Sequence, residues 1–286
     1  MTLPAETYVS HLTLATGDLA RLTAFYTQIL GLTVHSQSAE AVHLGGPDGA
    51  AFLTLLSERG ARAQPPLATG LYHFAILLPS RLALAQMLAH LIQTGTALSG
   101  ASDHRVSEAL YLNDPDGNGV ELTRDRPRAE WPWRNGLVGM TVDPLDLHRL
   151  LAQGNAAHEA WAAVPPGTRL GHVHLRVRDL DATARFYQDV LGFDATARYP
   201  GALFVSAGGY HHHFGLNIWE SRGAPPLPPD AEGLRDVMIS LPDSASLEAL
   251  AGRLRASNWE FTQENKTLAL RDPSANVLRA AVDSGK

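Results

Sequence analysis

The chain repeats itself with an offset of 161 residues, and this repeat limits the folds it can adopt. The segment His-Leu-Thr-Leu-Ala-Thr-Gly-Asp-Leu at 11–19 is matched by His-Val-His-Leu-Arg-Val-Arg-Asp-Leu at 172–180. Two further matches follow without a gap, Phe25-Tyr26 with Phe186-Tyr187 and Leu30-Gly31 with Leu191-Gly192. Repetition of this kind indicates that one supersecondary unit is used more than once.

Each copy begins as a strand that leads into a helix. Asp18 and Asp179 are placed to cap the two helices, because a short side-chain oxygen can accept the first free backbone N–H groups. Apolar residues between 19 and 30 recur at helical spacing, and Gly31 is placed to end the helix in a left-handed turn. Short strands separated by Gly, Pro and Asp turns follow the helix.

A weaker version of the same pattern follows in each half. A strand over 71–78 leads into a helix over 81–93. Its counterpart is a strand over 235–241 with a helix near 244–256. The sequence therefore predicts an α+β fold made of four βαβββ units.

The four units are expected to pair into two tandem domains, because 286 residues are too many for one ordinary domain. We predict an N-terminal domain over 1–125 and a C-terminal domain over 169–286. Between them, 126–168 contains Trp131-Pro132-Trp133 and a short helix candidate at 144–153. We interpret this segment as a linker that packs on the domains.

Composition excludes several classes of protein. The net charge of −6, without a cluster of Lys and Arg, disfavours nucleic-acid and anionic-membrane binding. The chain has no cysteine, so disulfides, thiolate metal sites and cysteine nucleophiles are excluded. No segment approaches the roughly 18 apolar residues of a membrane span, and the N-terminus does not read as a signal peptide. We expect a cytoplasmic enzyme or binding protein.

Three polar residues stand on predicted strands among apolar ones: His11, His73 and Glu121. Strand alternation places large apolar neighbours on the opposite face and small neighbours beside the polar side chains. Taken singly, each of them is explained by hydrogen bonding in a strand. Two imidazoles and one carboxylate that met in space would form a metal site with open positions, as in non-haem Fe(II) oxygenases.

Four βαβββ units in two tandem copies resemble the vicinal oxygen chelate superfamily, which holds glyoxalases, extradiol ring-cleaving dioxygenases and antibiotic-resistance binding proteins. The resemblance covers about 8–124 and 170–283, and it implies half-open barrel domains with a metal at the centre. The implied metal ligands are His11, His73 and Glu121. Glyoxalases usually add a ligand from the strand at 51–56, which is Ala-Phe-Leu-Thr-Leu-Leu here, so the resemblance favours the dioxygenase branch.

A second resemblance concerns the extradiol dioxygenase signature. His104, Leu110-Tyr111, Asp114-Pro115, Gly117 and Glu121 follow that signature in spacing, whereas Ser102 departs from it. By this resemblance Glu121 binds iron, and His104 and Tyr111 contact the substrate. The segments at 70–79 and 205–213 are similar to those of bacterial two-domain catechol 2,3-dioxygenase-like proteins.

The second copy departs from the metal-binding pattern. It keeps His172, but Asp236 stands where the second histidine belongs and Arg279 where the glutamate belongs. An arginine cannot ligate a cation, so we expect this site to be dead or repurposed. His211, His212 and His213 favour a polar pocket or a subunit contact over a second metal site with His172 or His174, because adjacent strand residues alternate faces.

The resemblance thus implies an extradiol-type dioxygenase that acts on a catechol-like aromatic diol with O₂ and contains Fe(II) or Mn(II). Tyr111 is expected to hydrogen-bond a substrate oxygen, and His104 to exchange a proton near neutral pH. A glyoxalase-like lyase or isomerase and a non-catalytic binding protein for a small aromatic or antibiotic are the alternatives. A homo-oligomer is also expected from the resemblance.

Overall fold

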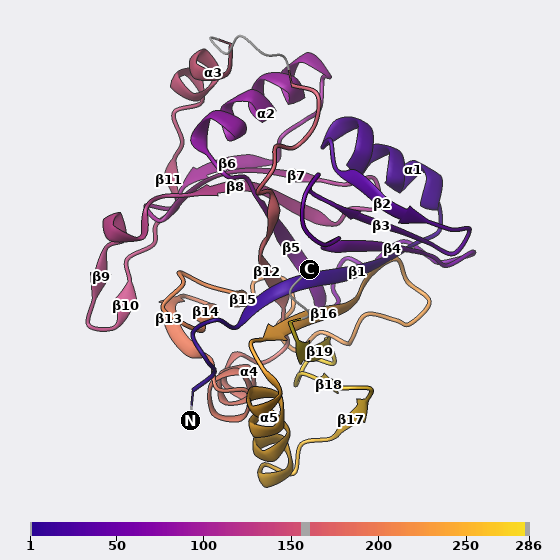
Figure 1. The fold of residues 1–286 in the computed structure, drawn as a ribbon, viewed down its shortest axis with the longest axis vertical. Helices are drawn as coiled ribbons and strands as arrows, with labels where there is room; N and C mark the ends of the chain where they lie inside the picture. The colour runs from indigo at the N-terminus through magenta and orange to yellow at the C-terminus, as the bar shows by residue number, and fades with distance from the viewer. Residues whose placement is uncertain (1, 156–160, 284–286) are drawn as a thin grey trace. The chain divides into compact units, whose positions relative to one another are not determined.

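The computed structural model describes residues 2–155 and 161–283, and Figure 1 shows the course of the chain. The chain divides into two compact units, each assembled from segments that are far apart in the sequence. Unit 1 comprises Met1–Ala15, Arg62–Tyr72 and His172–Lys286, and unit 2 comprises Thr16–Ala61 and His73–Gly171. These compact units combine segments from both halves of the chain, whereas the predicted domains 1–125 and 169–286 each follow one copy of the sequence repeat. The limits of those domains stay a prediction.

All four predicted βαβββ units are present, which confirms the α+β fold class. The first has β1 (Tyr8–Thr16), α1 (Leu19–Ala24), a π-helical turn (Phe25–Ile29), β2 (Thr33–Gln37), β3 (Ala41–Gly45) and β4 (Leu53–Ser57). The second has β5 (Gly70–Leu77), α2 (Arg81–Gln93), β6 (Gly100–Asp103), β7 (Ser107–Asn113) and β8 (Gly119–Asp125). The third has β12 (Arg169–Arg176), α4 (Leu180–Arg185), a π-helical turn (Phe186–Val190), β13 (Asp194–Tyr199), β14 (Ala202–Ser206) and β15 (Phe214–Asn217). The fourth has β16 (Gly233–Leu241), α5 (Ser244–Ala256), β17 (Phe261–Glu264), β18 (Thr267–Arg271) and β19 (Val277–Val282).

The first helix of each copy forms for the reasons that the sequence gives. Asp18 Oδ1 accepts a hydrogen bond from the backbone N–H of Arg21 at 3.0 Å, and Asp179 caps α4 in the same way. The helix then widens into a π-helical turn, and Gly31 follows at a φ of +74°, as expected for a left-handed turn after a helix. The sequence pattern did not distinguish this π-turn from a continued α-helix.

In unit 1, one run of paired strands has the order β17–β18–β19–β16–β1, and another has the order β12–β15–β14–β13. β16 and β19 are parallel, whereas β1 is antiparallel to β16. The first strand of the chain therefore pairs with the first strand of the fourth βαβββ unit. Leu12 and Leu14 on β1 are fully buried, which matches the apolar face that strand alternation predicted.

In unit 2, the strands run in the order β11–β6–β7–β8–β5 and, separately, β4–β3–β2. β5 and β8 are parallel neighbours, and β8 is antiparallel to β7. Phe74 and Ile76 on β5 are fully buried. The strands β5, β7 and β8 carry most of the candidate site residues that the sequence analysis identified.

The segment 126–168, which the sequence analysis interpreted as a linker, has secondary structure of its own. It contains a 3₁₀ turn (Arg128–Glu130), β9 (Trp133–Arg134), β10 (Leu137–Val138), β11 (Asp143–Pro144) and α3 (Leu147–Asn155). β11 pairs with β6, and α3 lies where the sequence placed a helix near 144–153. Residues 156–160 of this segment lie outside the described residues.

None of the helices within 2–155 and 161–283 has both the length and the apolar character needed to cross a membrane.

Candidate functional site

His73 and Glu121 meet in unit 2. They lie on the parallel neighbours β5 and β8, where Ala75 pairs with Glu121 and His73 pairs with Gly119. Residues in register on adjacent strands share a face, so both side chains project to the same side. His73 Nε2 is 3.0 Å from Glu121 Oε2, and both residues are buried. The short side chains at 75 and 119 leave room on this face.

The separation of these two atoms suits two ligands of one divalent ion. Ligand atoms about 2.1 Å from an ion and at right angles to each other across it lie about 3.0 Å apart. His73 Nε2 and Glu121 Oε2 show this distance, which also serves a direct hydrogen bond. An imidazole and a carboxylate form a donor set that binds Fe(II) and Mn(II). The pair therefore fits part of a metal site.

Tyr111 and His104 stand next to this pair in unit 2. Tyr111 on β7 is the direct cross-strand partner of Glu121, and its ring centroid is 5.5 Å from that of His73. The Tyr111 hydroxyl lies 2.7 Å from His104 Nε2. The structure thus brings together four of the five residues that the sequence nominated: His73, His104, Tyr111 and Glu121.

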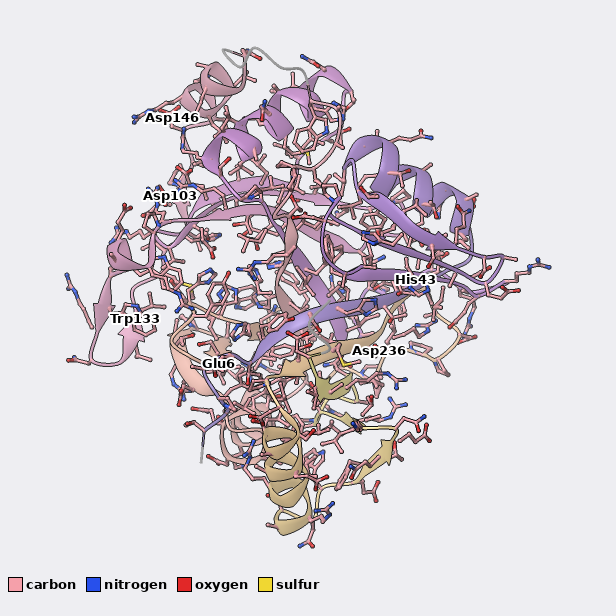
Figure 2. The ribbon with its side chains drawn as sticks, in the orientation of Figure 1. Glu6, His43, Asp103, Trp133, Asp146 and Asp236 are labelled. Atoms are coloured by element: carbon pink, nitrogen blue, oxygen red, sulfur yellow. The ribbon has the colours of Figure 1, made fainter. Side chains whose placement is uncertain are left out.

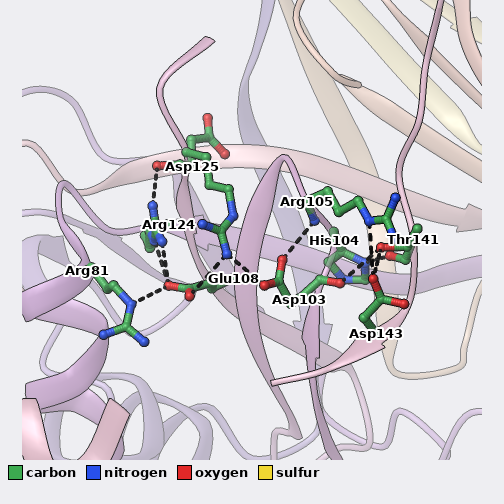
Figure 3. Close-up of polar contacts among 10 residues, drawn as sticks. Arg81, Asp103, His104, Arg105, Glu108, Arg124, Asp125, Thr141 and Asp143 are labelled. Atoms are coloured by element: carbon green, nitrogen blue, oxygen red, sulfur yellow. Dashed lines mark hydrogen bonds and ion pairs between the residues drawn. The ribbon is translucent and has the colours of Figure 1, made fainter. Parts of the chain in front are cut away.

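The sequence missed the residues that hold His104 in place. The other ring nitrogen of His104, Nδ1, lies 2.6 Å from the backbone carbonyl oxygen of Thr141, in the segment 126–168 (Figure 3). The Thr141 hydroxyl donates to Asp143 Oδ2 at 2.8 Å, and Arg105 Nε donates to the same carboxylate at 3.3 Å. No motif marked Thr141 or Asp143 in the sequence, because their role depends on β11 pairing with β6.

Glu108 anchors the end of β7 away from Tyr111. Its carboxylate is buried and receives hydrogen bonds from Arg81 Nε at 2.8 Å and Arg124 Nε at 2.8 Å, as Figure 3 shows. Arg126 bridges Glu108 to Asp103. A buried carboxylate needs such partners, because an unpaired buried charge is strongly unfavourable. The network fixes β6, β7 and β8 relative to one another and so supports the face that carries Glu121.

Asp114, in the signature motif, shapes the turn that precedes β8. Asp114 Oδ1 accepts hydrogen bonds from the backbone N–H groups of Asp116 and Asn118, both at 2.9 Å. Asp114 Oδ2 accepts from the Tyr26 hydroxyl at 2.8 Å and from Asn118 Nδ2 at 2.9 Å. Burial raises the pKa of Asp114 to about 6 despite these hydrogen bonds, which act in the opposite direction. Asp272 repeats this arrangement with Tyr187 in unit 1.

His11 belongs to unit 1, where it lies on β1 beside β16. It pairs with Met238, and Met238 pairs in turn with Arg279 of β19, so these three side chains share a face. Thr13 Oγ1 donates to Asp236 Oδ1 at 3.3 Å on the same face, and Figure 2 labels Asp236. Within unit 1, His11 therefore shares a sheet face with Asp236 and Arg279, which replace the second histidine and the glutamate in the second sequence copy.

The remaining histidines of unit 1 form a buried aromatic cluster. His211 Nδ1 lies 2.9 Å from His212 Nδ1, and the rings of His172 and His212 are 4.0 Å apart between centroids. His174 Nε2 lies 3.0 Å from Asn217 Nδ2, and His213 Nδ1 accepts from the backbone N–H of Ala207 at 3.2 Å. A polar pocket or a subunit contact stays a prediction for these residues.

The family follows from comparison with known proteins. The sequence profile of the glyoxalase/bleomycin resistance protein/dioxygenase superfamily matches residues 8–122 and 169–277. The chain belongs to this superfamily. Two matches in one chain agree with the internal repeat, and the four βαβββ units have the vicinal oxygen chelate fold.

Three known proteins are similar to this chain, two dioxygenases in sequence and one glyoxalase in structure. Catechol-2,3-dioxygenase from Bacillus subtilis (strain 168) is 42% identical over 273 residues, which cover 94% of each chain. Biphenyl-2,3-diol 1,2-dioxygenase 3 from Rhodococcus globerulus is 27% identical over 54% of this chain and 89% of its own. The crystal structure of glyoxalase I from Zea mays superposes with a TM-score of 0.58 at 16% identity, over 96% of this chain and 92% of that chain, which shows a shared fold.

Proposed function

We propose that the chain is a metal-dependent extradiol-type dioxygenase that cleaves the ring of a catechol-like aromatic diol with O₂. The observation that carries this proposal is the placement of Tyr111 and His104 beside His73 and Glu121 on one face of unit 2. The similarity to a catechol-2,3-dioxygenase at 42% identity supports it. We also propose that the protein acts as a cytoplasmic homo-oligomer.

His73 and Glu121 would hold the metal, Fe(II) or Mn(II), together with a histidine as the third ligand. The resemblance implies His11 for this third ligand. His172 is the second candidate, because it occupies the position of His11 in the other sequence copy. The side chain of Arg279 shares a face with His11 and disfavours a cation there, so the two histidines must be tested in parallel.

A bound metal of this kind supplies Lewis acidity and a common binding point for the diol and O₂. The residues of unit 2 would supply the rest. The Tyr111 oxygen would accept a hydrogen bond from one substrate hydroxyl, and His104 would accept the proton that Tyr111 shares with it. Ring cleavage breaks one carbon–carbon bond and places both atoms of O₂ in the product, so it requires no external reductant.

The decisive experiment combines metal analysis with oxygen uptake. The full chain is reconstituted anaerobically with Fe(II), and the bound iron and the O₂ consumed with a panel of catechols are measured. We expect one iron per chain and one O₂ per diol, with both lost in Glu121→Gln, because an amide is a much weaker ligand than a carboxylate. Glu130→Gln, at an exposed position, is the matched control and should change neither value.

The third ligand is identified by the same measurement in His11→Ala and His172→Ala. Loss of iron in His11→Ala alone supports the implied set, whereas loss in His172→Ala alone replaces His11 by His172. Turnover of a 2-oxoaldehyde thiol adduct without O₂ consumption would instead identify a lyase or isomerase. Tight binding of an aromatic compound after complete chelation, with no turnover, would identify a binding protein.

A further inference from the structure

We propose that the segment Thr141–Asp143 fixes His104 in the tautomer that carries its proton on Nδ1, with Asp143 as a positioning residue. This inference deepens the proposed function and rests on it, since it assigns the direction in which the Tyr111–His104 pair passes a proton. The segment lies outside the signature motif and within the stretch that the sequence indicated as a linker.

The contacts of His104 determine the tautomer. Nδ1 lies 2.6 Å from the carbonyl oxygen of Thr141, and a carbonyl oxygen accepts hydrogen bonds but cannot donate one. His104 Nδ1 must therefore carry a proton. In the neutral ring Nε2 is then an acceptor, and the Tyr111 hydroxyl, 2.7 Å away, donates to it. The opposite tautomer would place two lone pairs against each other at His104 Nδ1.

Asp143 holds the carbonyl group of Thr141 where His104 needs it. The Thr141 hydroxyl donates to Asp143 Oδ2 at 2.8 Å, and the backbone N–H of Thr141 donates to the carbonyl oxygen of His104 at 3.3 Å. Arg105 Nε donates to the same carboxylate oxygen at 3.3 Å, and β11 pairs Asp143 with Asp103. The hydrogen bond from Thr141 lowers the pKa of Asp143, with Arg105 acting in the same direction, so this carboxylate stays ionised at neutral pH.

The tautomer sets what Tyr111 can do. With its own proton directed to His104, the Tyr111 oxygen presents lone pairs on its other side and can accept a hydrogen bond from a substrate hydroxyl. The proton then has one path, from the substrate hydroxyl to Tyr111 and from Tyr111 to His104 Nε2. With the other tautomer, Tyr111 would receive a hydrogen bond from His104 and direct its own proton to the substrate, and the protonated Nε2 of His104 could not take up a proton from Tyr111.

The tautomer is measured directly by long-range ¹H–¹⁵N spectra of the full chain labelled with ¹⁵N-histidine, at pH 7.5, with and without diamagnetic Zn(II). His104→Gln assigns the His104 signals by their loss. We expect a protonated Nδ1 and an unprotonated Nε2 in the wild type, and a mixture of tautomers in Asp143→Ala. Thr141→Val keeps the carbonyl group but removes the bond to Asp143, and should give the same mixture.

Asp230→Ala is the matched control, because Asp230 also forms an exposed ion pair with an arginine, Arg62, at 2.7 Å. It should leave the His104 signals unchanged. In a ring-cleavage assay we expect Asp143→Ala to lower kcat about 10-fold with iron content unchanged, as for other residues that orient a functional histidine.

A wild-type Nε2–H signal, or unchanged signals in both Asp143→Ala and Thr141→Val, would overturn the proposal. The spectra do not depend on turnover. A chain with the expected tautomer but no dioxygenase activity would therefore reject the proposed function and keep the assignment of the tautomer.

Discussion

Arg279 Nε lies 3.3 Å from Asp236 Oδ2, and this ion pair occupies the place in unit 1 that His73 and Glu121 occupy in unit 2. Arg279 pairs with the residue two positions after Asp236, and Glu121 pairs with the residue two positions after His73. Both strand pairs are parallel, so the register is the same in the two units. The opposite charges of Asp236 and Arg279 neutralise each other at this position, where the other unit keeps a histidine and a glutamate.

The first prediction is that a second metal site can be restored in unit 1. In Asp236→His/Arg279→Glu, an imidazole and a carboxylate would share a face with His11, and this two-histidine, one-carboxylate set is complete in a chain whose first site uses His172 as its third ligand. We expect Fe(II) content to rise from one to about two ions per chain by elemental analysis.

Asp236→His/Arg279→Gln is the control for this experiment, because it removes the cation without adding a carboxylate ligand. It should keep the metal content of the wild type. A double variant that folds, as judged by circular dichroism, and gains no metal would contradict the prediction. It would show that the positions in the two units share their strand register but not the ability to bind a metal.

The fold could be predicted from the sequence because the repeat and the strand–helix pattern are local signals. The helices at 81–93 and 244–256 match α2 and α5 residue by residue. The pairing of β1 with β16 could not be predicted, since these strands are separated by more than two hundred residues and nothing local in either specifies the other. Strand partners are set by tertiary packing.

In the candidate site too, the residues that could be predicted are those of a local sequence motif, and the residues brought in by strand pairing could not be predicted. His104 and Tyr111 were found from a motif whose residues are close in sequence, and the structure joins them by a hydrogen bond. Asp114 was recognised only as part of the motif, and its three hydrogen bonds within the turn and the fourth from Tyr26 became visible with the structure. Thr141 and Asp143 carry no sequence signal, because their roles depend on the pairing of β11 with β6.

The second prediction concerns Tyr111→Phe. Removal of the hydroxyl deletes the acceptor for the substrate hydroxyl and the donor to His104, while the ring still packs against His73. We expect kcat to fall about 100-fold, the lower end of the range for a lost acid–base group, with metal content unchanged. Tyr8→Phe, which removes a surface hydrogen bond to Asp283 in unit 1, should keep full activity.

The third prediction concerns the pH dependence of stability. The pKa of Asp114 in the folded protein is raised from 3.8 to about 6, chiefly by burial, so the folded state binds this proton more tightly than the unfolded state. Its contribution to stability is therefore full below about pH 4 and is lost as the pH rises through about 6. The shift corresponds to about 3 kcal/mol at 1.36 kcal/mol per unit.

The measurement is denaturant unfolding of the wild type and Asp114→Asn between pH 4.5 and 7.5. Because a neutral amide does not titrate, the free energy of unfolding of the wild type relative to the variant should rise as the pH falls through 6. Asp243→Asn is the control: its capping hydrogen bonds from Ser246 lower the pKa of Asp243, so its effect appears only below about pH 4. Parallel curves for the wild type and Asp114→Asn would contradict the prediction.

The fourth prediction compares two glycines in helices. A Cβ on Gly154 of α3 would lie 2.2 Å from the backbone carbonyl oxygen of Ala85 in α2, whereas a Cβ on Gly252 of α5 would meet nothing within 4 Å. Gly154→Ala should therefore lower the free energy of unfolding by about 1 to 3 kcal/mol, since the two helices must separate. Gly252→Ala should raise it by about 0.5 to 1 kcal/mol, because alanine reduces the freedom of the unfolded chain. Thermal unfolding of the two variants beside the wild type measures both, and a Gly154→Ala variant as stable as the wild type would mean that α3 does not rest on α2 at this position.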